Sequence, residues 1–222
     1  MNVTTLFSFV VLSSVLSSKG ASAGVASKKR TVGILIFEDV EVLDFAGPFE
    51  VFSVSSQLFD HRFFDVKIIA KTKDPVIAVN GLSVNPHYSF NNAPELDILI
   101  IPGGYGARAV VRDKETLKWI EKVIPKTELT MSVCTGAILL AKLGLLDNKT
   151  YCTHHTLYSF VQGLAPTAKP KKSKRFIQSN KKLYTSAGIS AGIDLSFHIV
   201  EKLHGKDVAK NTAMYMEYTG YK

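Results

Sequence analysis

The chain has 222 residues, of which 46% are hydrophobic and 10% aromatic, and its formal net charge is +8. Such a composition excludes an intrinsically disordered protein, because disordered chains lack the apolar residues that a packed core needs. The length is enough for one sizeable domain, or at most two small ones.

Part of the positive charge lies in two short runs, at residues 28–30 and 169–175. We interpret both as solvated loops, with a dedicated anion-binding patch as the alternative. No recognition helix, zinc-finger spacing or interleaved aromatic residue accompanies either run, so the sequence does not favour nucleic-acid binding.

The N-terminus has the pattern of an export signal. Residues 6–16 are apolar apart from serines, and Ala21-Ser22-Ala23 has the form of a signal-peptidase site. The stretch is too short to span a bilayer, although no Lys or Arg precedes it. We therefore expect a signal peptide at residues 1–23, a flexible basic lead at 24–30 and a domain at 31–222. The mature protein would be secreted or periplasmic and free of the membrane; a retained anchor is the alternative.

The domain begins with a pattern typical of a parallel sheet. Residues 31–37 form a continuous apolar run, as in a strand covered on both faces. Residues 42–52 follow with apolar side chains at helical spacing. Asp44 is expected just before this helix, and Pro48 near its start, where proline is tolerated.

Strands and helices then alternate along the chain. Asn80-Gly81 predicts a hairpin turn between two short strands. The alternation predicts a single α/β domain with a doubly wound, mostly parallel sheet between helices. The further expected strands are 64–70, 76–79, 82–84, 96–101, 129–133, 151–155, 176–179 and 183–186, and the further helices are 113–123, 137–143, 188–203 and 208–218.

Unusual residues follow four of these strands. In open α/β sheets, functional groups gather at the carboxyl ends of the strands. The first strand leads to Asp44, and a later one ends at Gly103-Gly104. The strand after that leads to Cys134-Thr135-Gly136, and another is followed by His154-His155. We expect these groups to meet at one edge of the sheet.

Cys134 lies at a sharp junction between a strand and a helix, which is the geometry of a nucleophile elbow. A helix N-terminus stabilises an anion, so we expect a pKa of the thiol below about 8.5. The alternatives are a buried, unreactive cysteine and a disulfide with Cys152, which the separate strand ends disfavour. Asn148-Lys149-Thr150 would be a glycosylation site in a eukaryotic host.

The other candidate residues have structural alternatives. Gly103 and Gly104 could offer backbone amides to a substrate oxygen or could simply form a tight turn. Asp44 could be catalytic or could cap the helix. His154 could be a base, a substrate contact or a structural polar residue. Two adjacent histidines without a third ligand type predict no metal site.

Six motifs, in order and at compatible spacings, give the chain a resemblance to the ThiJ/PfpI superfamily of class I glutamine-amidotransferase-like domains, and within it to isonitrile hydratases. They are Phe37-x-x-Val40-x-x-Leu43-Asp44-x-x-Gly47-Pro48-x-x-Val51, Ile101-Pro102-Gly103-Gly104, Ser132-Val133-Cys134-Thr135-Gly136, Gly144-Leu145-Leu146, Thr153-His154 and Gly188-Ile189-Ser190-Ala191-Gly192-Ile193-Asp194.

One position discriminates among the activities of this superfamily. Protease- and glyoxalase-like members carry a histidine directly after the nucleophilic cysteine, and here that position is Thr135. Hydratase-like members pair Cys-Thr with an aspartate from the first loop, which Asp44 matches. Sensor domains of AraC-type regulators share this pattern, but only four residues follow Tyr218, too few for a DNA-binding domain.

The resemblance implies a lyase that hydrates an isonitrile to an N-substituted formamide, without a cofactor, and a homodimer as the state of assembly. It implies Cys134 as nucleophile, Asp44 as general acid and base, Thr135 as a positioning group and Gly104 as a stabiliser of developing charge. Gly103 and His154 would contact the small-molecule substrate. Another thiol-dependent hydrolase or deglycase, or a redox or small-molecule sensor without catalysis, is the alternative.

Overall fold

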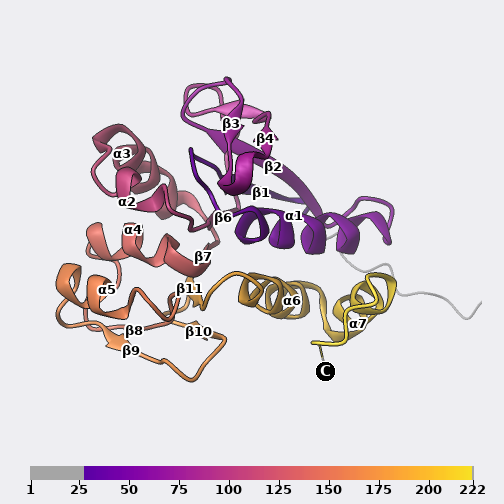
Figure 1. The fold of residues 1–222 in the computed structure, drawn as a ribbon. Coiled ribbons are helices and arrows are strands. Elements are labelled where there is room, and N and C mark those ends of the chain that lie inside the picture. The colour runs from indigo at the N-terminus through magenta and orange to yellow at the C-terminus, as the bar shows by residue number, and fades with distance from the viewer. Residues whose placement is uncertain (1–27, 222) are drawn as a thin grey trace, which may run out of the picture.

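A computed structural model describes residues 28–221 (Figure 1). The expected signal peptide at residues 1–23 lies outside the described part, and so does most of the lead that follows it. Within residues 28–221, no helix is long and apolar enough to cross a membrane.

A seven-stranded sheet forms the centre of the domain. Every pair of neighbouring strands is parallel except one at the edge of the sheet, where β10 (Phe176–Gln178) runs antiparallel to β11 (Leu183–Ser186). The order across the sheet is β10 (Phe176–Gln178), β11 (Leu183–Ser186), β7 (Leu129–Ser132), β6 (Ile98–Ile101), β1 (Arg30–Leu35), β2 (Phe64–Ala70) and β5 (Tyr88–Ser89).

Helices cover both faces of this sheet (Figure 1). Successive residues of β1 point to opposite faces, so Ile34 joins one hydrophobic cluster and Leu35 the other. The doubly wound α/β fold is thereby confirmed. One face carries α1 (Val42–Gln57), α6 (Ala191–His204) and α7 (Lys206–Tyr215); the other carries α2 (Ala107–Val110), α3 (Lys114–Val123), α4 (Ala137–Lys142) and α5 (Tyr158–Leu164).

Two small sheets lie outside the main one. The predicted hairpin is confirmed as antiparallel β3 (Val76–Ile77) and β4 (Ser83–Val84). The strand expected before His154 is shorter than predicted: β8 (Thr150–Tyr151) pairs with β9 (Lys169–Pro170). The prediction that it ends at the edge of the main sheet is therefore wrong, because its hydrogen-bonding partner is β9.

The start of α1 also differs from the prediction. The helix begins at Val42, so Asp44 lies within its first turn, and the residue before the helix is Glu41. Asp44 therefore does not cap the helix. Pro48 lies in the helix interior, where it has no N–H to donate to the carbonyl four residues earlier, that of Asp44. The buried face of α1 still matches the predicted spacing, since Phe45 and Phe52 are in the core.

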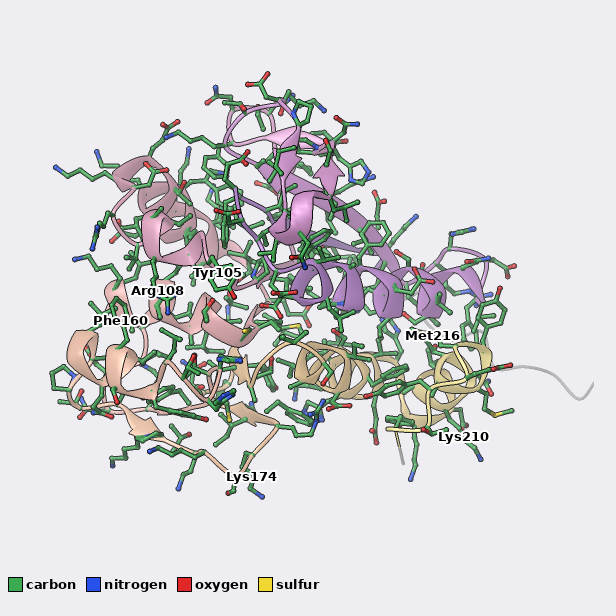
Figure 2. The ribbon with its side chains drawn as sticks, viewed as in Figure 1. Tyr105, Arg108, Phe160, Lys174, Lys210 and Met216 are labelled. Atoms are coloured by element: carbon green, nitrogen blue, oxygen red, sulfur yellow. The ribbon has the colours of Figure 1, made fainter. Side chains whose placement is uncertain are left out.

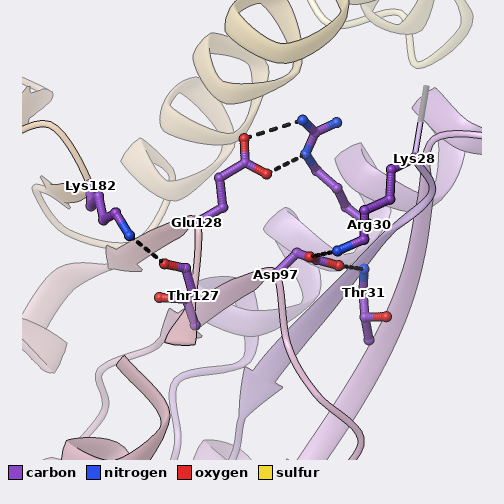
Figure 3. A network of polar contacts seen from close by, with 7 residues as sticks. All are labelled: Lys28, Arg30, Thr31, Asp97, Thr127, Glu128 and Lys182. Carbon is purple, nitrogen blue, oxygen red and sulfur yellow. Dashed lines mark hydrogen bonds and ion pairs between the residues drawn. The ribbon is translucent and has the colours of Figure 1, made fainter. Parts of the chain in front are cut away.

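Ion pairs join the starts of β1, β6 and β7, at the edge of the sheet opposite Cys134 (Figure 3). Arg30 donates two hydrogen bonds to Glu128, at 2.7 and 3.2 Å. Asp97 pairs with Lys28 and accepts from the Thr31 amide. The expectation of a flexible lead up to residue 30 is therefore wrong at its end, because Arg30 already belongs to β1. Lys28 and Arg30 of the first basic run therefore both form ion pairs with acidic side chains.

Candidate thiol site

Four adjacent parallel strands bring the candidate site together. Their order is β11, β7, β6 and β1, and each ends at the same edge of the sheet. The segment after β1 carries Asp44, that after β6 carries Gly103, that after β7 carries Cys134, and that after β11 carries Ile189. Residues that are up to 145 positions apart therefore surround one point, as the rule for open sheets predicts.

Cys134 has a backbone that few side chains adopt. Its φ is +58°, in the left-handed region where residues other than glycine are uncommon. The amide of Cys134 donates to the Ala187 carbonyl at 3.1 Å, and its carbonyl accepts from the Thr153 hydroxyl at 2.8 Å. These bonds hold the turn from both sides. The side chain is 4% exposed and lines a cavity, as expected for a nucleophile elbow.

The carboxyl group of Asp44 is buried beside this thiol. Its Oδ2 accepts a hydrogen bond from the Gly103 amide at 2.9 Å. Its Oδ1 is buried and has no hydrogen-bond partner within the described structure. An unpaired buried oxygen is costly when the carboxyl is charged, so the site favours the protonated acid.

Gly103 is needed because the loop passes very close to both side chains. A Cβ at this position would lie 2.3 Å from Thr135 Oγ1 and 2.9 Å from Asp44 Oδ2. Thr135 in turn accepts from the Gly104 amide at 2.9 Å and donates to the Gly104 carbonyl at 3.1 Å. Both glycine amides therefore already have acceptors. Stabilisation of substrate charge by Gly104 requires its amide to leave Thr135, and that role stays a prediction.

Burial raises the pKa of both acidic groups. The pKa of Asp44 rises to about 7, because desolvation outweighs the hydrogen bond from Gly103. The pKa of Cys134 rises to about 12, first through burial and then through the negative charge of Asp44. The prediction of a thiol pKa below about 8.5 is therefore wrong: the backbone amides of Ile189 and Thr135 lower it, but by less than burial and the carboxylate raise it. Near neutral pH the pair holds its thiol proton and titrates at the carboxyl.

Ile189 contributes its backbone to both groups. Its amide lowers the pKa of Asp44 and of Cys134, because an N–H dipole stabilises either anion. Its φ is +51°, which is uncommon for a β-branched residue. Ile189 is not among the site residues predicted from the sequence, although it follows β11, a strand next to β7, where the rule for strand ends predicts functional groups.

The cavity at the thiol has a volume of about 140 Å³. Its walls bring together apolar groups, the acidic Glu41, the basic Arg108 and the thiol of Cys134. Tyr105, just before α2, and Arg108, on α2, also line it (Figure 2), and Tyr105 is 71% exposed. Composition alone gave no signal for these positions, which lie on loops and short helices. The lining residues are Glu41, Gly104, Tyr105, Arg108, Cys134, Thr135, His154, Thr156, Leu157 and Ile189.

His154 also lines this cavity. Its Nδ1 accepts from the Thr156 amide at 3.4 Å and lies 2.8 Å from the Thr156 hydroxyl. Because an amide can only donate, the proton of the neutral ring is on Nε2. Burial and the neighbouring His155 lower the pKa of His154. No hydrogen bond joins His154 to Cys134 among the described residues, although both line this cavity, so the role of His154 as a base stays a prediction.

Within residues 28–221, no three His, Cys, Asp or Glu side chains are grouped as a metal site requires. Cys134 and Cys152 are free thiols. The site thus defines a class of protein: an α/β domain whose buried cysteine faces a carboxyl of raised pKa.

The chain belongs to the DJ-1/PfpI family, whose sequence model matches residues 30–202. It is 32% identical over 187 residues to an isonitrile hydratase of Pseudomonas putida, a match that covers 84% of this chain and 78% of the relative. It is 25% identical over 181 residues to the HTH-type transcriptional regulator GbdR of Pseudomonas aeruginosa, where the match covers 81% of this chain but 48% of the regulator.

Solved structures agree with this assignment. A ThiJ/PfpI family protein from Pseudomonas syringae superimposes with a TM-score of 0.78 at 25% identity, over 94% of this chain and 86% of the other. Drosophila melanogaster DJ-1beta superimposes with a TM-score of 0.73 at 16% identity, over 85% of this chain and 98% of the other. The second similarity concerns the fold alone.

Proposed function

We propose that the protein hydrates a small isonitrile, R–NC, to the N-substituted formamide R–NH–CHO, with Cys134 as the nucleophile. The observation that carries this proposal is the buried pairing of Cys134 with Asp44, whose pKa of about 7 suits a group that must both accept and return a proton. The 32% identity to an isonitrile hydratase supports the choice of substrate class.

In the first step, the Cys134 sulfur attacks the terminal carbon of the isonitrile. The S–C bond forms while Asp44, in its carboxylate form, takes the thiol proton. Transfer of this proton from Asp44 to the same carbon gives a thioimidate, R–N=CH–S–Cys134. The carboxylate regenerates, so the step adds the thiol across the carbon without any other reactant. A thiol of high pKa can react in this way because its proton leaves as the new bond forms.

In the second step, water attacks the thioimidate carbon. Asp44 takes a proton from the water and passes it to the nitrogen, which gives the tetrahedral R–NH–CH(OH)–S–Cys134. The C–S bond then breaks, and the hydroxyl proton returns through Asp44 to the leaving sulfur. The product is R–NH–CHO, and the net change is the addition of one water molecule.

Other residues position these groups. Gly103 holds Asp44 through its amide, and Thr135 locks the loop through its two bonds to Gly104. Thr135 lines the cavity, which supports a second role for its hydroxyl in orienting the attacking water. Buried, prearranged donors of this kind need little reorganisation during the reaction.

A substrate panel with a matched variant tests the proposal. The wild-type protein is offered benzyl isonitrile, a simple amide and a glycated thiol adduct, and products are followed by NMR. We expect N-benzylformamide to form with the wild type and not with Cys134→Ala, while the thermal melting curves of both proteins remain similar. Turnover of the isonitrile by Cys134→Ala would remove the thiol from the mechanism, and turnover of the amide or adduct alone would favour the hydrolase alternative.

A second candidate is a ligand sensor without turnover, which the 25% identity to a transcriptional regulator favours. A purely redox sensor is less well supported, because peroxide reacts with thiolates and burial keeps Cys134 protonated. Intact-mass measurement after mild peroxide treatment separates the cases. Oxidation confined to Cys134, with no turnover of any compound on the panel, would favour a sensor over an enzyme.

The family resemblance also leads us to propose a homodimer, and the apolar N-terminal run followed by Ala21-Ser22-Ala23 leads us to propose an exported protein. Light scattering of the purified chain measures the first, and N-terminal sequencing of the mature protein measures the second, with cleavage expected after Ala23.

A further inference from the structure

A second cavity adjoins the thiol cavity. Its volume is about 330 Å³, and the two cavities share His154 and Ile189 as common walls. A ligand whose reactive end lies at Cys134 could therefore extend past His154 into this larger space. The remaining lining residues are Thr153, His155, Tyr158, Lys172, Ala187, Gly188 and Ser190.

The charge that lines this second cavity is the cation of Lys172. Lys172 and two histidines line it, and no acidic residue does. The nearby carboxylate of Asp194 is already paired with Arg175. Glu41 lies across His154, on the wall of the thiol cavity. The cavity is thus positive in character, whereas the thiol cavity is lined by one acidic and one basic side chain, Glu41 and Arg108.

The positive charge comes from the second basic run, residues 169–175, which comprises β9 and the loop from β9 to β10. Unlike Lys28 and Arg30, Lys172 makes no ion pair within the described structure. Its ammonium instead lies 5.6 Å from the centre of the Tyr158 ring, a cation–π contact that keeps the charge at the cavity wall.

The loop that carries Lys172 is anchored to the core. The Cys152 thiol donates to the carbonyls of Lys171 and Lys174 at 3.4 and 3.5 Å. The Lys171 amide donates to the Tyr151 carbonyl at 2.9 Å, and the Ala187 amide donates to the Arg175 carbonyl at 2.7 Å. Lys172 is therefore held on both sides by backbone contacts rather than carried on a free loop.

Two neutral donors complement this cation. Ser190 Oγ accepts from the Arg175 guanidinium at 3.1 Å, which leaves the hydroxyl proton for another acceptor. The Nε2–H of His154 is the second donor. A Cβ on Gly188 would lie 2.4 Å from Cδ2 and 3.4 Å from Nε2 of His154, so the donor edge of this ring lies over the glycine that lines the second cavity.

We propose that this cavity is a subsite for a carboxylate carried on the substituent of the substrate, with Lys172 as its cation and Ser190 and His154 as hydrogen-bond donors. The inference rests on the proposed function for the reaction at Cys134, but the subsite itself is defined by residues outside that chemistry. The proposed subsite narrows the substrate class from any small isonitrile to ω-isocyano carboxylates.

Kinetics with a matched pair of substrates test the subsite. An ω-isocyano carboxylate and its methyl ester are compared at low ionic strength with the wild type, Lys172→Gln and Lys210→Gln. Lys210 lies on α7, beyond the far end of α6 from the basic loop (Figure 2), and its substitution removes the same charge. We expect the wild type to prefer the carboxylate. In Lys172→Gln, KM for the carboxylate should rise about fivefold, with kcat and the ester unchanged. An equal preference in the wild type and Lys172→Gln would overturn the proposal.

Alkylation of Cys134 separates the failure of the subsite from the failure of the proposed function. If neither isonitrile is consumed, N-iodoacetyl-β-alanine and its methyl ester replace them, and labelling of the Cys134 peptide is followed by mass spectrometry. The subsite predicts a ratio of carboxylate to ester rates that falls in Lys172→Gln and in 0.5 M salt, where charges are screened, but not in Lys210→Gln. A ratio that is the same in all three proteins would show that the subsite is absent.

Discussion

The two cysteines of this chain are both buried and both free, yet their surroundings give them different roles. Cys134 has a φ of +58°, faces Asp44 and lines a cavity. Cys152 is 0% exposed, and its thiol donates to the carbonyls of Lys171 and Lys174. Burial raises the pKa of both thiols, to about 12 and about 11.

The pKa of the thiol therefore does not distinguish a reactive cysteine from a structural one here. The distinction comes from what each sulfur can contact. Cys134 has a carboxyl group that can take its proton and a space for a substrate beside it. Cys152 has two carbonyl acceptors and lines neither the thiol cavity nor the cavity beside it, so its proton holds a loop in place. A nucleophile of this type is activated by its neighbour at the moment of reaction rather than by a low resting pKa.

The largest effect on activity is expected from substitution of Cys134, and the same substitution of Cys152 should have almost none. Cys134→Ser should lower the rate of isonitrile hydration at least about 10³-fold, because it removes the covalent step. Cys152→Ser should retain the rate within about twofold, since the serine hydroxyl can donate to the same carbonyls. Steady-state assays of both variants measure this. Equal losses in the two would show that the comparison is wrong.

The second-largest loss of activity is expected from substitution of Asp44, the proton acceptor. Asp44→Asn should lower kcat about 10²- to 10⁴-fold, the usual contribution of a general acid–base. In the wild type, kcat/KM should rise with pH through an apparent pKa near 7, where Asp44 becomes the carboxylate. Asp44→Asn should lose this limb, whereas Asp147→Asn, at an exposed position, should keep it. A limb that persists in Asp44→Asn would assign the titration to another group.

A smaller loss of activity is expected when the reacting groups remain but their positions change. Gly103→Ala should lower kcat about 10²-fold, because its Cβ would displace Thr135 and Asp44. Gly163→Ala is the matched control, since a Cβ there meets no atom within 4 Å. The Gly163 variant should keep full activity. A fully active Gly103→Ala protein would mean that the exact contact between the loop and these side chains does not matter.

The raised pKa of Asp44 should also make the stability of the folded protein depend on pH. Its folded pKa of about 7 lies above its ordinary value of 3.8, so above pH 4 the native state holds a proton that the unfolded chain has lost. Stability of the wild type should therefore fall as pH rises from about 4 to about 7. Asp44→Asn has no such proton, so its free energy of unfolding should increase relative to that of the wild type over this range, by at most about 4 kcal/mol. Urea unfolding of both proteins at pH 4, 5.5 and 8 measures the difference, and a constant difference would contradict the raised pKa.

Patterns in the sequence predicted the fold and the place of the site. Apolar runs located β1 and β6, and the rule that function collects at strand ends brought Asp44, Gly103 and Cys134 together. The thiol pKa was mispredicted because a short helix start was weighed without the burial and the carboxylate that oppose it. Ile189 was not identified as a site residue because its contribution is a backbone amide, which no residue type signals.

The basic run at 169–175 is a second case in which the sequence did not reveal a residue beside a cavity. As a sequence it is typical of a solvated loop, and Lys172 is indeed exposed. Only the anchoring bonds of the loop and its place beside His154 reveal that one of its charges borders a cavity. Such relations depend on the tertiary fold and have no local pattern.

The central claim is that Cys134 forms a covalent bond to the isonitrile carbon, and rapid-quench intact-mass measurement during turnover of benzyl isonitrile tests it most directly. We predict an adduct whose mass equals the protein plus one isonitrile, located on the Cys134 peptide, that decays as N-benzylformamide accumulates. Formamide production without an adduct, or an adduct on Cys152 instead, would contradict the account.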